Sequence, residues 1–338
     1  MPGAVKKAMA WALNRGGLSA GKRRGLRGVT AILSYPRILP RGELLDNHPT
    51  GSALTGAAFR EHVQWLERHF DVISLNRLCS RYLIGEKPTR PTCVMTFDDG
   101  LIETFDVAWP IMEERNLTGT LFLPTDMIGT FDALPEIRIN RAALGILDKR
   151  TALMARFPDE QMPPECAFVI DLLVAGPATR KFVDAFQEKL TSVERSRLPE
   201  VIDWLCALGS VKDADKPTHL TWTHAKALAE SGFEIGSQSA SGVALDETDA
   251  MTAQTDLARS MSAISENIGR GPVPFRYPDG SRDERITRMV RKCGFLCGLT
   301  NNTGFAEKAP DLFSLPRIAV NQENAPSALA LEALLSFL

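Results

Sequence analysis

The chain has 338 residues, which is enough for one large domain or two smaller ones with a sizeable hydrophobic core. Its formal net charge of -2 argues against nucleic acid as a main partner, and its 44% hydrophobic and 24% charged residues are typical of a globular protein. No apolar run approaches the roughly 20 residues of a membrane-spanning helix, so we expect no transmembrane segment.

Residues 1–28 contain several lysines and arginines, and we expect them to form a basic arm in front of a folded domain at residues 29–338. The only apolar stretch of this arm, residues 8–13, is shorter than the roughly 7–15 residues of the apolar region of a signal peptide. The six cysteines form no CxxC pair, and several lie in apolar runs, which indicates buried, reduced thiols. These features together predict a cytoplasmic protein.

Segments with the pattern of strands alternate with segments with the pattern of helices along most of the chain. The predicted strands are residues 29–33, 93–97, 119–123, 233–237, 273–277, 295–299 and 316–320. The predicted helices are residues 59–70, residues 101–116 with a kink or break at Pro110, residues 221–232 with Thr221 as N-cap, and residues 257–269. This alternation predicts an α/β fold whose parallel sheet is closed, or nearly closed, into a barrel.

Residues from about 130 to 217 interrupt the alternation. Their apolar residues follow helical spacing, as in residues 144–147, 182–190 and 202–208, and their charges are mixed. We therefore predict a helical insertion in the barrel, with packing as a lid more probable for it than a second active site.

The pentapeptide Thr96–Gly100 is the most informative segment of the chain. It follows an apolar run and places two adjacent carboxylates, Asp98 and Asp99, at the carboxyl end of a predicted strand. Chemistry in α/β folds is found at that end, and two adjacent acids repel, so one of them tends to bind a cation or to hold a proton. The alternative is an Asp-Gly turn that only ends a strand, and the pentapeptide alone does not decide between the two.

Three further segments occur in a telling order: residues 236–242, 275–280 and 315–320. Together with residues 96–100 they resemble the polysaccharide deacetylase family, the chitooligosaccharide deacetylase-like enzymes of carbohydrate esterase family four. The resemblance covers about residues 29–320 apart from the insertion. It implies a distorted (β/α) barrel and a hydrolase that removes N-acetyl or O-acetyl groups from sugars, acting on carbon–nitrogen bonds other than peptide bonds.

The resemblance also implies roles for single residues. Asp98 would act as the general base, and Asp99 would bind a divalent, zinc-type metal together with two histidines of the second motif. That metal would polarise the acetyl carbonyl and activate water. Arg276 would pair with Asp98 and orient it. The neighbouring residues assigned to the substrate pocket are Tyr277, Pro278, Asp279 and Gln238.

The chain departs from the family pattern at the second motif. The family has His-Ser/Thr-x-x-His there, whereas this chain has Gln238 and Gly242 at the two histidine positions. Catalytic zinc sites usually keep three protein ligands, and only Asp99 remains of this set. We therefore predict that the metal is absent or weakly bound, and that Gln238→His combined with Gly242→His would rebuild a three-ligand site.

Other ligands remain possible from the sequence. His62 and His69 are expected on an exposed helix face, but His48 follows a strand end and is not dismissed. An oxygen-only site for magnesium or calcium could use Asp98, Asp99, Asp279 and the Gln238 amide. We prefer the alternative that Asp279 only serves the turn at residues 278–280.

These observations predict a deacetylase-like hydrolase fold that acts on acetylated sugars and is weak or inactive because its metal site is degenerate. The alternative is a non-catalytic carbohydrate-binding or regulatory protein of polysaccharide biosynthesis. A cytoplasmic location would suit an acetylated oligosaccharide or a lipid-linked sugar precursor. The sequence leaves the sugar and any protein partner open.

Overall fold

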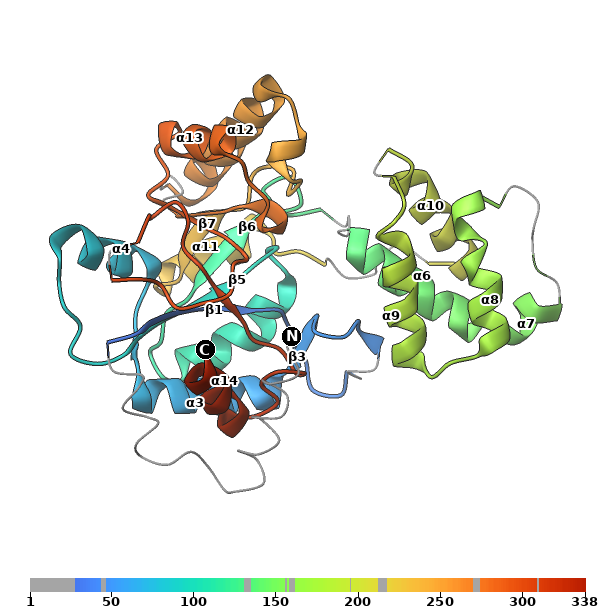
Figure 1. Cartoon of the computed structure of the whole chain (residues 1–338), viewed down its shortest axis with the longest axis horizontal. Coiled ribbons are helices and arrows are strands. Elements are labelled where there is room, and N and C mark those ends of the chain that lie inside the picture. The colour runs from blue at the N-terminus through green and yellow to red at the C-terminus, as the bar shows by residue number, and fades with distance from the viewer. Residues whose placement is uncertain are drawn as a thin grey trace. The chain divides into compact units, whose positions relative to one another are not determined.

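The computed structural model describes residues 28–43, 47–130, 135–155, 157, 162–194, 196–211, 218–269, 274–308 and 310–338. The chain forms two compact units, which are coloured by residue number in Figure 1. The barrel unit comprises the described residues up to Arg41 together with Leu54–Thr130 and His219–Leu338, and the helical unit comprises Gly42–Ala53 and Phe131–Thr218. The expected basic arm at residues 1–28 lies outside the described residues except for Gly28.

The barrel unit is built around an eight-stranded sheet in which every strand pair is parallel. Its strands are β1 (Thr30–Tyr35), β4 (Asp71–Val72), β5 (Thr92–Phe97), β6 (Thr120–Leu123), β7 (Glu234–Ser237), β8 (Pro274–Arg276), β9 (Cys297–Leu299) and β10 (Ile318–Ala319). Their order is β10-β1-β5-β6-β7-β8-β9, and β4 also pairs with β5. Two short strands, β2 (Arg37–Leu39) and β3 (Ala53–Thr55), form a separate pair that the sequence did not predict.

The sheet curls until its two ends approach each other. The segment that links β9 to β10 makes a parallel bridge between Leu299 and Leu315, and Arg317 N donates to Asn302 O at 2.9 Å. Parallel strands with right-handed twist curl in this way, and their carboxyl ends then meet at one rim. The predicted distorted α/β barrel is therefore confirmed. A functional site is expected at the rim where the carboxyl ends of the strands meet.

Helices cover the sheet of the barrel unit. They are α3 (Gly56–His69), α4 (Leu75–Ile84), α5 (Trp109–Glu113), α11 (Trp222–Glu230), α12 (Ala250–Ile268), α13 (Glu284–Lys292) and α14 (Ala328–Phe337). The predicted N-cap of α11 is confirmed: Thr221 Oγ1 accepts from His224 N at 3.3 Å, and His224 Nδ1 accepts from Thr221 N at 3.2 Å. This reciprocal pair satisfies two N–H groups that a helix start otherwise leaves unpaired.

The helix predicted at residues 101–116 differs from the expectation. It contains a π-helix at Thr104–Ala108, which continues as α5 from Trp109. Pro110 lies in the first turn of α5, where a residue without a backbone N–H is tolerated, so the predicted interruption takes the form of a change from π-helix to α-helix next to Pro110.

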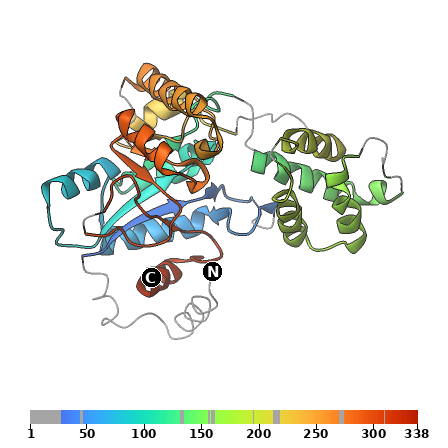
Figure 2. The same ribbon diagram turned by 45° about the horizontal axis from the view of Figure 1, so that its top comes forward.

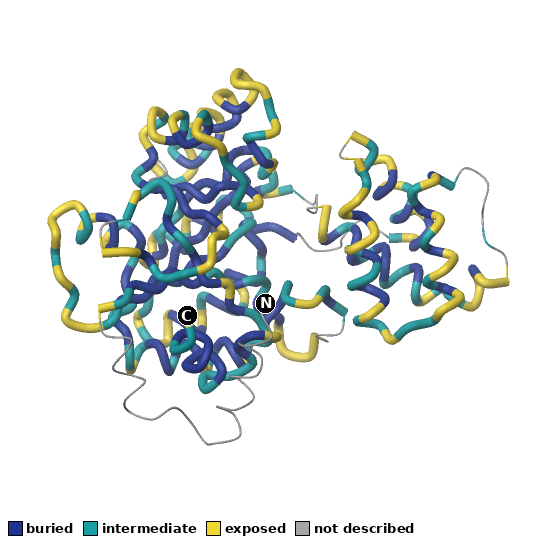
Figure 3. Tube along the Cα trace, viewed as in Figure 1, coloured by how far each residue is buried: buried dark blue, intermediate teal, exposed yellow. Residues whose placement is uncertain are grey.

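The core of the barrel unit lies between the sheet and the helices, where the dark blue segments of Figure 3 gather. All six residues of β5 are buried, as expected for a parallel strand covered on both faces. α14 lies beside α3 (Figures 1 and 2). His62 on α3 is fully buried there, with Nε2 3.2 Å from Ser327 O, so its predicted exposure is wrong. His69 is half-buried, and its Nδ1 lies 2.8 Å from Trp65 O.

The helical unit has a core of its own. Its helices are α6 (Pro135–Asp148), α7 (Arg150–Ala155), α8 (Phe168–Ala175), α9 (Thr179–Leu190) and α10 (Leu198–Gly209). α6 and α10 approach closely, because a Cβ on Gly145 would lie 2.4 Å from Gly209 O. Residues 42–53 also belong to this unit, which the sequence did not predict: Thr50 N and Oγ1 each donate to the Asp184 carboxylate at 2.7 Å. None of the described helices is long and apolar enough to cross a membrane.

Candidate active site

The three motif turns share an unusual backbone geometry at the rim of the barrel. Asp99, Ser239 and Asp279 have φ values of 66°, 64° and 55°, and they are three of the five described non-glycine residues with positive φ. This left-handed region is costly for residues with a side chain, although aspartate tolerates it better than most. Such strain tends to gather at functional sites, and here it follows the strands β5, β7 and β8.

Two arginines, Arg276 and Arg317, form ion pairs with Asp98. Arg317 Nη1 lies 2.8 Å from Asp98 Oδ1, and Arg276 Nε lies 3.4 Å from Oδ2. Ser34 Oγ, at the end of β1, is 3.5 Å from Oδ2. Burial alone would raise the pKa of Asp98, but the charges of Arg276 and Arg317 and the hydrogen bonds of Arg317 and Ser34 outweigh it and hold the pKa below its ordinary value.

Asp99 is hydrogen-bonded to the amide of Gln238. Gln238 Nε2 donates to Asp99 Oδ1 at 2.7 Å, and Asp99 N donates back to Gln238 Oε1 at 3.2 Å. Burial raises the pKa of Asp99, and the charge of Asp98 adds to this rise, against the opposing effect of Arg276. The two adjacent carboxyl groups therefore differ in character: Asp98 favours the ionised form and Asp99 retains a proton more readily.

The loop after β7 is fixed by short-range hydrogen bonds. The Asp256 carboxylate accepts from the backbone N–H groups of Ala240 and Ser241, and Ser239 Oγ accepts from Gly242 N at 3.0 Å. Gly242 has φ 73°, and a Cβ there would lie 3.1 Å from Pro124 Cβ. A histidine at position 242 would thus be strained and crowded, so the expected rebuilding of a three-ligand site by two substitutions is not supported by the backbone.

The residues at this site do not fit the zinc-type metal of the family. Gln238 turns an N–H toward Asp99, and an N–H offers no lone pair to a metal. Within the described parts of the chain, no group of three or more His, Cys, Asp or Glu residues is placed to hold a metal ion. Asp279 does not support the alternative of an oxygen-only metal site, because its side chain is exposed in the turn at residues 278–280.

Two of the residues assigned to the substrate pocket, Tyr277 and Pro278, are buried in the protein instead. Tyr277 is fully buried, its ring packs edge-on against Phe275 with centroids 5.4 Å apart, and its hydroxyl donates to Phe313 O at 3.1 Å. Pro278 is buried at the start of the turn. A side chain with no exposed surface cannot line an open pocket, so the pocket assignment of Tyr277 is corrected. Of the four pocket residues, Gln238 is the one in contact with the acidic pair.

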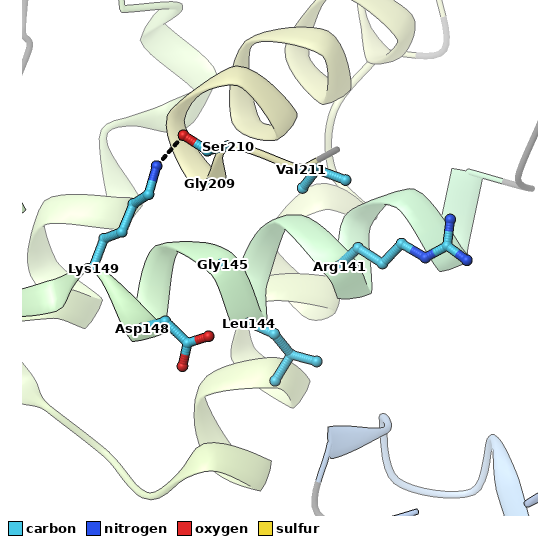
Figure 4. A pocket seen from close by; sticks show the side chains of 8 residues that line it. All are labelled: Arg141, Leu144, Gly145, Asp148, Lys149, Gly209, Ser210 and Val211. Atoms are coloured by element: carbon cyan, nitrogen blue, oxygen red, sulfur yellow. Dashed lines mark hydrogen bonds between the residues drawn. The ribbon is translucent and has the colours of Figure 1, made fainter. Parts of the chain in front are cut away.

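His48 belongs to the helical unit, whereas Asp98 and Asp99 belong to the barrel unit. Its side chain is buried, and its Nε2 lies 2.7 Å from Glu43 Oε1. A pocket of about 450 Å³ also lies in the helical unit, between α6 and α10 (Figure 4). Lys149 on its wall bonds to Ser210, which ends α10.

Sequence reasoning missed the role of Arg317. Residues 315–320 were recognised as one of the family-like segments, but no function was assigned to the arginine among them. The available signal was an arginine enclosed by Pro316 and Ile318 in an apolar run, because a buried guanidinium requires a partner of opposite charge. The structure supplies that partner in Asp98.

Part of the chain matches a known family. Residues 175–298 match the family model described as Polysaccharide deacetylase. This range includes the second and third motifs but not residues 96–100. The protein YxkH of Bacillus subtilis (strain 168), whose name calls it a polysaccharide deacetylase, is 24% identical over 110 residues. That match covers 32% of this chain and 39% of YxkH, which is less than half of the relative's length.

Solved structures of deacetylases share the fold. The Streptococcus pyogenes deacetylase PplD in complex with acetate has a TM-score of 0.56 at 13% identity, covering 91% of this chain and 98% of its own. IcaB from Ammonifex degensii has a TM-score of 0.57 at 15% identity, covering 91% and 97%. The predicted resemblance to the polysaccharide deacetylase family is thereby confirmed: residues 175–298 match the model of that family, and the chain shares the barrel fold of these solved structures.

Proposed function

We propose that the protein hydrolyses acetyl groups of an acetylated polysaccharide or oligosaccharide, slowly and without a tightly held transition metal. The observation that carries this proposal is Asp98, a carboxylate at the barrel rim that Arg276 and Arg317 hold in its ionised form. An ionised carboxylate can accept a proton from water, which is the first requirement of a hydrolase.

The proposed reaction uses Asp98 as general base and then as general acid. Asp98 takes a proton from a water molecule, whose oxygen attacks the carbonyl carbon of the acetyl group. The carbon–nitrogen bond then breaks, the amine nitrogen takes the proton from Asp98, and acetate leaves. We expect a slow rate, because a carboxylate with a lowered pKa is a weak base and the second motif lacks the donor set of the family.

The direct test is acetate release from N-acetylglucosamine oligomers by the full chain, measured together with newly formed amines. Asp98→Asn is the matched control, because it removes the base and keeps the size of the side chain. We expect a low rate that is abolished by Asp98→Asn and unchanged by exhaustive chelation. A rate that disappears with the chelator would contradict metal independence.

Non-catalytic binding of an acetylated sugar is the second candidate. It is favoured by the Gln238 amide on Asp99 and by Gly242, which take the places of both histidines. YxkH and PplD carry deacetylase names, which supports hydrolysis as the first candidate. Saturable binding of the oligomers with no acetate release above the Asp98→Asn background would reverse that order.

We propose a cytoplasmic substrate, either an acetylated oligosaccharide or a lipid-linked sugar precursor. The support is that all six cysteines are free thiols, which suits a reducing compartment. Fractionation of cells that produce the protein tests the location. Recovery in an oxidising compartment would overturn this part of the proposal and leave the chemistry at Asp98 untouched.

A further inference from the structure

Arg317 is buried at the centre of the candidate site. It directly precedes β10, and only 3% of the residue is exposed. Its backbone is tied down as well, since Arg317 N donates to Asn302 O at 2.9 Å. Burying a guanidinium away from water is costly unless its N–H groups and its charge are both satisfied, so its partners explain its place.

All three nitrogens of the Arg317 guanidinium group donate hydrogen bonds. Nη1 donates to Asp98 Oδ1 at 2.8 Å, Nε donates to Thr300 O at 3.2 Å, and Nη2 donates to Asn301 Oδ1 at 2.8 Å. Nη1 also lies 3.4 Å from Thr96 Oγ1, and that hydroxyl donates to Leu33 O at 2.9 Å. With so many fixed contacts, the planar group has one orientation, and it imposes that orientation on the carboxylate it touches.

Arg276 makes the looser of the two contacts with Asp98. Its Nε lies 3.4 Å from Oδ2, against 2.8 Å for Arg317 Nη1 and Oδ1. The closest contacts of the two arginines are thus to different oxygens of Asp98, and the contact of Arg317 is the shorter one. The family resemblance gave the orienting role to Arg276 alone.

We propose that Arg317 is the principal positioning residue of Asp98, because it fixes the plane in which that carboxylate meets the proton it accepts. Arg276 then has a secondary positioning role, at Oδ2 of Asp98. Arg317 acts through Asp98 and is not itself a catalytic residue. The geometric part of the proposal stands on its contacts, whereas its effect on rate rests on the proposed hydrolysis.

The first test does not depend on turnover. Crystal structures of the full chain with Arg317→Lys and with Arg276→Lys compare two equal changes at the two oxygens of Asp98. Lysine keeps the charge and loses the fork. We expect the Asp98 carboxylate to rotate in Arg317→Lys and to keep its orientation in Arg276→Lys. An unmoved carboxylate in Arg317→Lys, or a larger rotation in Arg276→Lys, would overturn the proposal.

The second test uses acetate release from N-acetylglucosamine oligomers. Arg317→Ala should lower kcat at least tenfold with KM changed less than threefold, and added guanidinium ion should restore part of kcat. Arg282→Ala is the control, since Arg282 bonds to Ser314 and Thr287 away from Asp98, and guanidinium should not affect it. A fall in kcat accompanied by an equal rise in KM, with no rescue by guanidinium, would show a merely structural role and overturn the proposal.

The two tests separate this inference from the proposed function. If the parent protein releases no acetate, the proposed function fails, while the two lysine variants still decide which arginine positions Asp98. If Arg317→Ala does not fold, Asn301→Ala takes its place, because it removes one anchor of the fork and no charge. That variant should lower kcat with KM maintained, and an unchanged kcat would count against the positioning role.

Discussion

At the scale of single residues, the neighbours Asp98 and Asp99 have different partners. Asp98 faces two guanidinium groups, whereas Asp99 faces the amide of Gln238. The backbone turn enforces this separation, because φ of 66° at Asp99 directs consecutive side chains differently from an extended strand. One carboxyl group is thereby available as a base at neutral pH, and the other is part of a hydrogen-bonded frame.

The different partners predict different costs of removing each charge. Asp98→Asn should destabilise the protein by about 3–5 kcal/mol, because it removes the buried carboxylate that both arginines contact. Asp99→Asn should cost less, about 1 kcal/mol, since the Asp99 carboxylate accepts from the neutral amide of Gln238, and a hydrogen bond of this kind contributes about that much. Urea unfolding of the two variants measures both values. Equal costs would mean that the arginines do not depend on Asp98.

Glycine 242 should resist replacement more than an exposed glycine with a similar backbone. Gly242 (φ 73°) and Gly232 (φ 97°) both lie in the left-handed region, but only Gly242 has Pro124 in the way of a Cβ. Gly232→Ala should cost about 1–2 kcal/mol from the backbone alone. Gly242→Ala should cost more, and the difference between the two melting curves isolates the contact with Pro124. Similar melting curves would mean that Pro124 does not hinder a side chain at position 242, so that a histidine could be accommodated there.

At the scale of elements, α3 and α14 are joined through a buried histidine. His62 Nε2 lies 3.2 Å from Ser327 O, just before α14, and the Tyr35 ring lies 6.0 Å from the imidazole. Burial lowers the pKa of His62 to about 4, although hydrogen bonds to the Ser327 and Ala325 carbonyls oppose this. The neutral imidazole therefore belongs to the folded state.

This predicts a loss of stability on acidification. The unfolded chain takes up a proton on His62 below its ordinary pKa of about 6.5, whereas the folded chain does not until about 4. The contribution is thus fully present above pH 6.5 and is lost as the pH falls to 4, by up to about 3 kcal/mol. His62→Gln, which keeps an N–H donor, should flatten the unfolding free energy over this range. His69→Gln, on the same helix, is the control and should retain the slope.

At the scale of the whole molecule, the barrel gathers residues from five places in the chain. Ser34 is the second-last residue of β1, Asp98 and Asp99 follow β5, Gln238 follows β7, Arg276 ends β8, and Arg317 precedes β10. The two carboxyl groups and the two arginines balance in charge. The site is thus assembled from the chain's own groups, with a zinc-type metal not required for neutrality.

We therefore predict that the protein is indifferent to transition metals. Elemental analysis after purification without chelator should find well under one zinc, cobalt or nickel per chain. Micromolar zinc should leave the melting temperature unchanged, because a ligand that binds only the folded state would raise it. A stoichiometric metal, or a zinc-dependent rise in melting temperature that Asp99→Asn abolishes, would contradict this prediction.

Much of the fold could be predicted from the sequence. The apolar runs of β1, β5, β6 and β7, the Thr221 cap and the glycine that ends α12 are local signals, and the structure confirms them. The helix at residues 101–116 is different, because no local pattern predicted its π-helical stretch at Thr104–Ala108. The burial of His62 was missed for the same reason, since α14 covers it and lies more than 260 residues later.

The sequence by itself determined the resemblance to the family, the alternation of strands and helices, and the two carboxylates with Arg276 at the ends of strands. These follow from local residue patterns and from motif order. The tertiary structure alone decided that Arg317 grips Asp98, that Gln238 holds Asp99, and that Tyr277 lies in the core. The reason is physical: these contacts join residues 36 to 219 positions apart, and only the curling of the parallel sheet brings such distant side chains to one rim.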